Sequence, residues 1–136
     1  DLASIGMPLD ERSLSDMHRR KTGALLQASV LMGAACGPVD ASAERALSDY
    51  GSAIGLAFQV VDDILDVTQE SQTLGKTAGK DHHANKPTYV SVLGLDAARH
   101  QAAQLRDKAL TALRESGLQG TVNLSLLADM VVERDN

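Results

Sequence analysis

The chain has 136 residues, enough for one domain that buries roughly two-thirds of its unfolded surface. Hydrophobic residues make up 43% and charged residues 23%, values near the globular average, which excludes wholesale disorder. The formal net charge of −5 argues against a nucleic-acid binder, because such proteins usually carry a basic surplus. The single Cys36 excludes an intrachain disulfide and a cysteine-based zinc site. No apolar run reaches the roughly 20 residues of a membrane span, and no signal peptide is visible, so we expect a cytoplasmic protein.

Aromatic residues make up only 2% of the chain, so Ala, Leu and Val must fill the core. Small aliphatic side chains let helices approach closely, which favours packed helices over a β-sandwich. The composition therefore predicts an all-α fold.

The first half of the chain contains two predicted helices. Residues 1–12 are expected to form a loop, and Ser13 is the predicted N-cap of a helix that ends at Gly37-Pro38. The second helix is predicted from about residue 42 to about residue 68. Its apolar positions recur at spacings of three and four: Leu47, Tyr50, Ile54, Ala57, Phe58, Val61 and Leu65.

The second half begins with a polar segment, residues 69–86, that is predicted to be a loop. A short helix over 87–94 is opened by its proline and ended by its glycine. A third long helix over 96–117, with Asp96 as its cap, places six small or aliphatic residues on one face: Ala98, Ala102, Leu105, Ala109, Ala112 and Leu113. A last helix is expected over about 123–134, capped by Asn123.

The second predicted helix carries a strip of polar side chains on a largely apolar surface. Four residues fall within an arc of about 100° at helical spacing: Gln59, Asp62, Asp63 and Asp66. Like charges one turn apart destabilise a helix by a few tenths of a kcal/mol per pair, so the carboxylates need lysines or a divalent cation. Oxygen donors favour a hard ion, above all Mg²⁺ where phosphates share its coordination sphere. The alternative interpretation is a solvated acidic face.

A cationic segment follows this acidic strip. Residues 76–86 carry a net charge of +2, whereas residues 62–70 carry −4. An anionic patch beside a glycine-containing cationic segment suits a substrate such as a diphosphate, bridged to the carboxylates by metal. The alternative is a flexible loop whose lysines merely offset the acidic helix.

The first predicted helix holds a second cationic cluster, His18-Arg19-Arg20-Lys21, directly before Gly23 and Ala24. Small residues at this point allow another helix or a ligand to approach closely. Positive charge in the middle of a helix then suggests an anionic partner. The alternative is a lysine whose stem covers apolar surface while its ammonium stays in water.

In this order, these pieces resemble the trans-isoprenyl diphosphate synthases, also called polyprenyl synthetases, and among them most closely the bacterial farnesyl diphosphate synthase type. The matching stretches are HRRKTGALLQAS at 18–29, GLAFQVVDDILDV at 55–67, LGKTAGKD at 74–81 with Lys86 downstream, and PTYVSVLGLDAAR at 87–99. The resemblance covers nearly the whole chain, and the combination of several motifs makes it specific.

The resemblance implies an all-α bundle around a central cavity. It also implies Mg²⁺-dependent condensation of isopentenyl diphosphate with an allylic diphosphate, such as dimethylallyl or geranyl diphosphate, to a short-chain product such as farnesyl diphosphate. By the same resemblance, Asp62, Asp63 and Asp66 match the second of two aspartate-rich motifs and hold the metal. Lys21 contacts the allylic diphosphate, Lys76 and Lys86 bind diphosphate, and Thr22 and Gln59 line the path of the carbocation.

The family's first aspartate-rich motif has no counterpart in this sequence. Residues 1–136 are therefore expected to form the C-terminal half of a single polyprenyl synthetase domain. That half is expected to be inactive alone, to expose apolar surface on the sides of its first two helices, and to belong to a homodimer. The family's basic C-terminal segment is matched only by Arg134, to which no role is assigned.

Two other functions stay open at this point. The chain can belong to a longer-chain polyprenyl synthase or another class I terpenoid enzyme, because product length depends on residues near the missing first motif. From a different class, it can be a non-catalytic helical subunit that regulates or dimerises. Mg²⁺-dependent binding of pyrophosphate separates the enzyme from the structural subunit.

Overall fold

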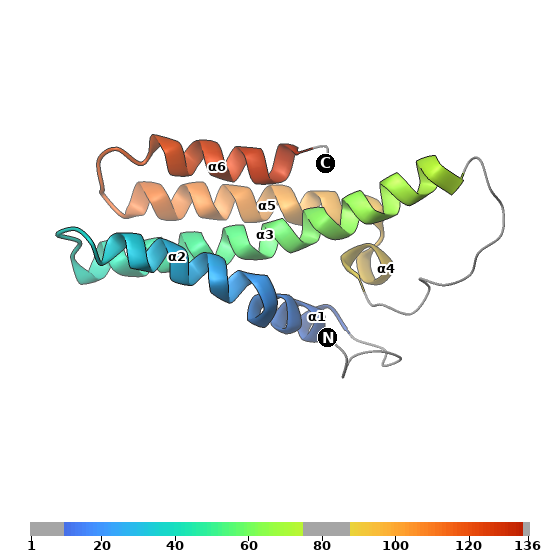
Figure 1. Ribbon diagram of the computed structural model, residues 1–136, viewed down its shortest axis with the longest axis horizontal. Helices are drawn as coiled ribbons and strands as arrows, with labels where there is room; N and C mark the ends of the chain where they lie inside the picture. Colours follow the sequence, from blue (N-terminus) through green and yellow to red (C-terminus); the bar gives the residue numbers. More distant parts are fainter. Residues whose placement is uncertain (1–9, 75–87, 135–136) are drawn as a thin grey trace.

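The computed structural model describes residues 10–74 and 88–134, with backbone alone at residues 11, 19, 21 and 70–74. Every element in these ranges is a helix, as predicted (Figure 1). The elements are α1 (Glu11–His18), the π-helix η2 (Arg19–Gly23), α2 (Ala24–Ala34), α3 (Ala41–Leu74), α4 (Tyr89–Leu93), α5 (Leu95–Glu115) and α6 (Val122–Glu133). None of these helices is both long and apolar enough to cross a lipid bilayer.

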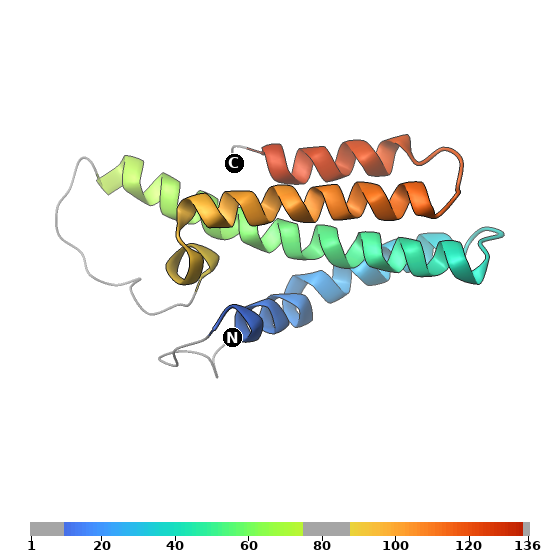
Figure 2. The same cartoon turned by 180° about the vertical axis from the view of Figure 1, so that it is seen from behind.

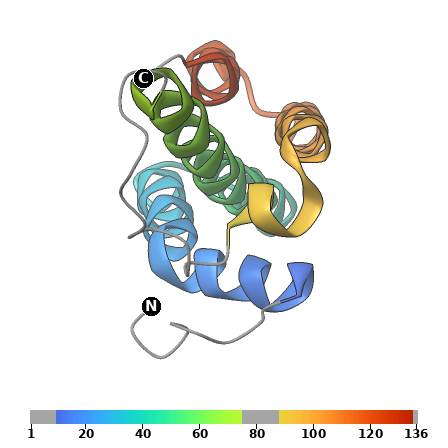
Figure 3. The same ribbon diagram turned by 90° about the vertical axis from the view of Figure 1, so that its right-hand side faces the viewer.

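Helix α3 runs through the middle of the molecule and contacts each of the other helices described here. Helices α5 and α6 pack side by side along one flank of α3, and α2 packs along another (Figures 1 and 2). Figure 3 shows α1 running at an angle to α2, with η2 at the bend between them. A π-helical turn is a known cause of such bends.

Two helices start on aspartate caps. The amide of Ser13 donates to Oδ1 of Asp10 (2.8 Å), so Asp10 is the cap and the prediction of Ser13 was wrong. Hydrogen bonds from Ser13 hold the pKa of the Asp10 carboxyl below its ordinary value. The amides of Ser42 and Ala43 donate to Oδ1 of Asp40 in the same way, at 2.9 and 2.8 Å. Each aspartate satisfies amides that have no partner within the helix.

Helix α3 extends to Leu74, past the predicted end near residue 68. The prediction of a loop from residue 69 was therefore wrong for residues 69–74. Residues 69–74 contain neither glycine nor proline, and their mostly polar side chains tolerate a helix. The rest of that predicted loop lies outside the described residues.

The three helices after this segment match the predicted ones, with different first residues. Thr88 caps α4 through a capping box with Ser91. Pro87, predicted to open this helix, lies outside the described residues. Gly94 adopts a φ of 85° between α4 and α5, and Gly117 adopts 66° after α5. Helix α6 begins at Val122, so the predicted cap Asn123 lies inside its first turn.

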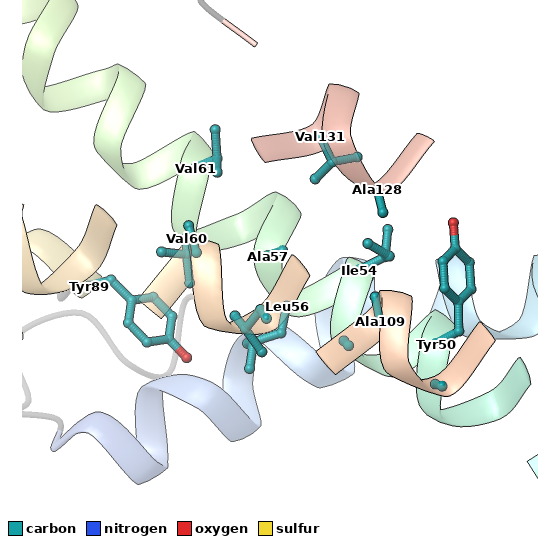
Figure 4. Close-up of a cluster of buried hydrophobic side chains, with 14 of the residues drawn as sticks. Tyr50, Ile54, Leu56, Ala57, Val60, Val61, Tyr89, Ala109, Ala128 and Val131 are labelled. Carbon is teal, nitrogen blue, oxygen red and sulfur yellow. The ribbon is translucent and has the colours of Figure 1, made fainter. Parts of the chain in front are cut away.

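The core forms where α3 meets α5 and α6. All six residues of the predicted apolar face of α5 are buried. Of the seven predicted on α3, five are buried, and Phe58 and Leu65 are partly buried. Figure 4 shows Tyr50, Ile54 and Ala57 of α3 beside Ala109 of α5 and Ala128 of α6.

The hydroxyl of Tyr50 ties this core to α6, because it donates to the carbonyl oxygen of Leu124 at 2.8 Å. The Tyr50 side chain is completely buried. Burial disfavours the phenolate and raises the pKa of Tyr50 to about 12.

Glycines bring α3 against α2 and η2. A Cβ added at Gly55 would lie 2.6 Å from Cα of Gly23, and one added at Gly51 would lie 2.9 Å from Cα of Gln27. The backbones touch at these two points, so no larger residue fits. Gly23 therefore does allow another helix to come close, as its place beside the cationic cluster suggested.

We predict that Gly55→Ala destabilises the chain although alanine is the better helix former. The added methyl group meets backbone rather than a movable side chain, and overpacking of this kind costs about 1–3 kcal/mol. Gly33→Ala is the matched control, because nothing lies within 4 Å of its added Cβ. The free energy of unfolding of Gly33→Ala should rise by about 0.5–1 kcal/mol. Urea unfolding of both variants tests this pair, and a stabilised Gly55→Ala would contradict the close crossing.

A second prediction concerns pH. The folded-state pKa of Tyr50 is raised from 10.0 to about 12, so its contribution to stability is full below pH 10 and is lost as pH rises toward 12. Tyr50→Phe removes this dependence, and also a hydrogen bond that contributes about 0.5–1.5 kcal/mol at neutral pH. Unfolding free energies measured across this window should fall more steeply for the wild type. If the unfolding free energies of the wild type and Tyr50→Phe changed in parallel with pH, Tyr50 would have the same pKa in the folded and unfolded states, which would contradict the prediction.

Candidate functional site

The polar strip of α3 lies at the boundary of the core, and the structure divides it. Asp62 and Asp66 have exposed side chains, whereas Gln59 and Asp63 are buried. The difference is large for the adjacent pair: 53% of the Asp62 side chain is exposed, against 12% for Asp63. The sequence had predicted one continuous strip, so this division is a finding of the structure.

Asp63 points toward α4 and α1. Its Oδ2 accepts a hydrogen bond of 2.8 Å from the backbone amide of Tyr89, the first residue of α4. The same oxygen lies 3.5 Å from Nε2 of His18, a contact that is an ion pair when the imidazole is protonated. Asp63 therefore holds the start of α4 against α3.

His18 completes this buried group. Its Nδ1 lies 3.1 Å from Oε1 of Gln59, and its ring stacks on the ring of Tyr89 with centroids 5.6 Å apart. We call His18, Gln59, Asp63 and Tyr89 the His18 cluster. This cluster joins three helices, α1, α3 and α4, that are far apart in the sequence.

Arg134, just after α6, reaches back to the exposed part of the strip. Its Nη2 donates to the carbonyl oxygen of Phe58 (3.0 Å) and lies 3.4 Å from Oδ1 of Asp62. The guanidinium sits 4.0 Å above the Phe58 ring, a cation–π contact. The sequence analysis assigned Arg134 no role, because no spacing rule connects residue 134 with residue 58.

The predicted cationic residues are described only in part. Lys21 and Thr22 lie in η2, which packs against α3 where Gly23 meets Gly55. Thr22 is half-buried, and the side chain of Lys21 lies outside what the structure describes. Lys76 and Lys86 are also outside the described residues. Single π-turns inside helices are frequent at functional sites, so the placement of η2 agrees with a role for this turn.

The described residues do not form a metal cage by themselves. No three histidine, cysteine, aspartate or glutamate side chains among them are gathered closely enough to hold an ion. Asp62 and Asp66 nevertheless present exposed carboxylates one helical turn apart. Mg²⁺ usually keeps several waters and takes one or two carboxylates plus substrate phosphates. This donor set therefore fits a metal shared with a phosphate ligand.

The sequence analysis missed His18 as an individual site residue and saw it only as part of a basic cluster. One signal was available: Leu14 and His18 are four residues apart and share a helical face. Leu14 is completely buried, and so His18 faces the interior as well. Its partners could not be found in this way, because 41 residues separate His18 from Gln59.

We predict that the two adjacent aspartates differ in their effect on stability. Asp63→Ala leaves the buried amide of Tyr89 without an acceptor, which costs about 1–3 kcal/mol. Asp62→Ala removes only an exposed contact to Arg134, which contributes less than about 1 kcal/mol. Asp63→Asn keeps an acceptor oxygen and should recover part of the loss. Equal losses for Asp62→Ala and Asp63→Ala in thermal unfolding would contradict this division.

Comparison with known proteins identifies the family. The family model described as "Polyprenyl synthetase" matches residues 3–119. The chain is 47% identical over 121 residues to a probable farnesyl diphosphate synthase of Sinorhizobium fredii, covering 86% of this chain and 36% of that protein. It is 43% identical over 135 residues to a chloroplastic geranylgeranyl pyrophosphate synthase of Catharanthus roseus, covering 99% of this chain and 37% of that protein.

A solved structure supports the same assignment. The crystal structure of a putative farnesyl-diphosphate synthase from a Marinomonas species superposes with a TM-score of 0.79 at 37% identity, over 98% of this chain and 44% of that one. The chain thus spans less than half the length of each of these three proteins. With most of its residues matched and its helices superposed on a solved relative, the chain belongs to the polyprenyl synthetase family.

Proposed function

We propose that this chain forms the half of a prenyl-transfer site that binds a diphosphate through metal. The reaction is condensation of isopentenyl diphosphate with an allylic diphosphate to a short-chain prenyl diphosphate. The observation that carries the proposal is the exposed pair Asp62 and Asp66, on the family-matched helix α3 that also packs against the turn bearing Lys21.

Each residue has a role that follows from its chemistry. Asp62 and Asp66 are the carboxylates best exposed to hold Mg²⁺, and Asp63 is the third predicted ligand, although its described contacts are made through Oδ2. When bound, Mg²⁺ stabilises the negative charge that develops on the departing diphosphate. Lys21 binds the allylic diphosphate, and Lys76 and the more peripheral Lys86 also bind diphosphate, by charge-assisted hydrogen bonds.

The hydrocarbon part of the substrate needs different surroundings. Thr22 and Gln59 supply oxygen dipoles that stabilise a carbocation without trapping it covalently. Gln59 is itself buried, so its side chain is shielded from water. The cysteine of this chain, Cys36, lies in the turn after α2 and is exposed, away from the Asp63 end of α3.

The rest of the site is expected from the part of the relatives that this chain does not span. Exposed apolar side chains support a helical partner on α2 and α6: Leu25, Met32, Val122, Leu126, Leu127 and Met130. The prediction named the first two helices: large apolar side chains are exposed on α2, but none is exposed on the described part of α3, so the prediction was wrong there. The exposed apolar side of α6 had not been predicted. A groove of about 490 Å³ runs between α2, α3 and α6. The helices of the family that this chain does not span are the expected occupants of these apolar sides. Homodimerisation and a cytoplasmic location stay predictions.

The length of the prenyl product is also a proposal. Relatives named as farnesyl and as geranylgeranyl synthases match at similar identity, 47% and 43%. The farnesyl type is preferred because the bacterial relative and the superposed structure carry that name. A longer-chain product is the alternative.

Calorimetry with inorganic diphosphate tests the proposed function. We expect the 136-residue chain to bind diphosphate with Mg²⁺ present and not without it, and we expect Asp62→Ala to abolish that binding. Asp49→Ala is the matched control, because Asp49 is an exposed aspartate on the same helix and the charge change is identical. With both prenyl substrates, the chain alone should show no condensation, since the opposing carboxylates are missing.

Three outcomes contradict the proposal. Equal loss in Asp49→Ala and Asp62→Ala would show general electrostatic attraction rather than a site. No Mg²⁺-dependent binding at all would favour the non-catalytic helical subunit. Condensation by this chain alone would show that the second set of carboxylates is dispensable.

A further inference from the structure

A buried histidine calls for an explanation in this chain. His18 is only 5% exposed, yet no role in diphosphate binding follows from its position. Burying an imidazole costs free energy unless its nitrogens find partners. Its neighbours in the His18 cluster are two predicted site residues, Gln59 and Asp63, and the first residue of α4.

The first contact fixes the Gln59 side chain. Oε1 of an amide can only accept, so Nδ1 of His18 is the donor across the 3.1 Å that separate them. A carbonyl oxygen has two lone pairs, and one remains for a cationic ligand. Without His18, the three rotatable bonds of Gln59 would let this dipole turn away. A dipole that is already oriented stabilises developing charge without reorganisation cost.

The second contact secures α4. Oδ2 of Asp63 accepts from the amide of Tyr89, and His18 covers this bond by stacking on the Tyr89 ring and by placing Nε2 3.5 Å from Oδ2. Residues 75–87, which include Lys76 and Lys86, join the end of α3 to the start of α4 in the sequence. The His18 cluster therefore anchors the point where the chain returns from the lysine-bearing segment.

We propose that His18 is a positioning residue for prenyl transfer, which holds the Gln59 amide in one orientation and, with Asp63, fixes the first turn of α4. This inference rests on the function proposed above. It assigns His18 no contact with substrate, because the imidazole is closed in by Gln59, Asp63 and Tyr89.

Nuclear magnetic resonance of the 136-residue chain tests the positioning directly. The wild type should show a slowly exchanging His18 ring N–H with nuclear Overhauser contacts to the Gln59 side chain, and a single pair of resolved Gln59 amide protons. This measurement needs no variant, so it decides the matter even if variants fail to fold. A rapidly exchanging ring N–H and averaged Gln59 resonances would overturn the proposal.

Two isosteric variants separate the contacts. The amide nitrogen of Asn can occupy the place of Nδ1, and that of Gln the place of Nε2. His18→Asn should therefore keep the Gln59 signature, whereas His18→Gln should lose it and keep the protection of the Tyr89 amide. His18→Leu should lose both, with exchange at Tyr89 faster by about tenfold relative to Ala109. Leu14→Ala is the control, because it loosens α1 without touching a polar contact.

The functional consequence is measured in an active synthase that contains this chain. His18→Leu should lower kcat by about tenfold with little change in KM, because a dipole acting on the cation is lost rather than a contact to the ground state. His18→Asn should restore most of that kcat. A raised KM with unchanged kcat in His18→Leu, which His18→Asn does not restore, would show that His18 has only a structural role.

The two proposals fail separately. If diphosphate binding with Mg²⁺ is absent, the proposed function fails whatever His18 does. If that binding is intact and the Gln59 resonances are the same in the wild type and His18→Leu, the positioning role alone is wrong. Exchange that rises equally at Tyr89 and Ala109 in His18→Leu would also overturn it, as this would be general loss of stability.

Discussion

The structure depends on one constraint: α3 must bury most of its circumference while it keeps carboxylates at its surface. It satisfies the first requirement with glycines, because Gly51 and Gly55 let α2 and η2 approach to backbone contact. It satisfies the second by placing Asp62 and Asp66 on the narrow side that remains exposed. Burial on several sides makes the helix rigid, and a rigid helix holds its polar side chains in fixed positions for a ligand.

The same constraint explains why adjacent aspartates differ. A step of about 100° along the helix moves Asp63 from the surface into the contact with α1 and α4. A buried carboxylate must be hydrogen-bonded, and the Tyr89 amide serves that need, while Nε2 of His18 lies 3.5 Å from the same oxygen. At the surface, Asp62 meets Arg134 from the far end of the chain. The strip is therefore held at both edges by residues that are distant in sequence.

Much of the fold could be predicted from local patterns. Apolar spacing of three and four located the helices over 42–68 and 96–117, and it named all six buried positions of the α5 face. Caps and helix-breaking residues located the first and the last helix. Helix ends were less predictable, since Asp10 and Ser13 are both good caps and only the hydrogen bond distinguishes them. In the candidate site, residue types indicated carboxylates and lysines. They could not show that Gln59 and Asp63 share a partner in His18, because tertiary contacts over tens of residues leave no local pattern.

The central claim is that a metal-bound diphosphate sits between the exposed aspartates of α3 and the turn η2. Mn²⁺ in place of Mg²⁺ tests it most directly, since this paramagnetic ion broadens amide resonances near it. With inorganic diphosphate present, the account predicts broadening at Asp62, Asp66 and Thr22, and unchanged signals at Glu115, at the far end of α5. Broadening spread over all exposed acidic residues, or broadening that diphosphate does not alter, would contradict it.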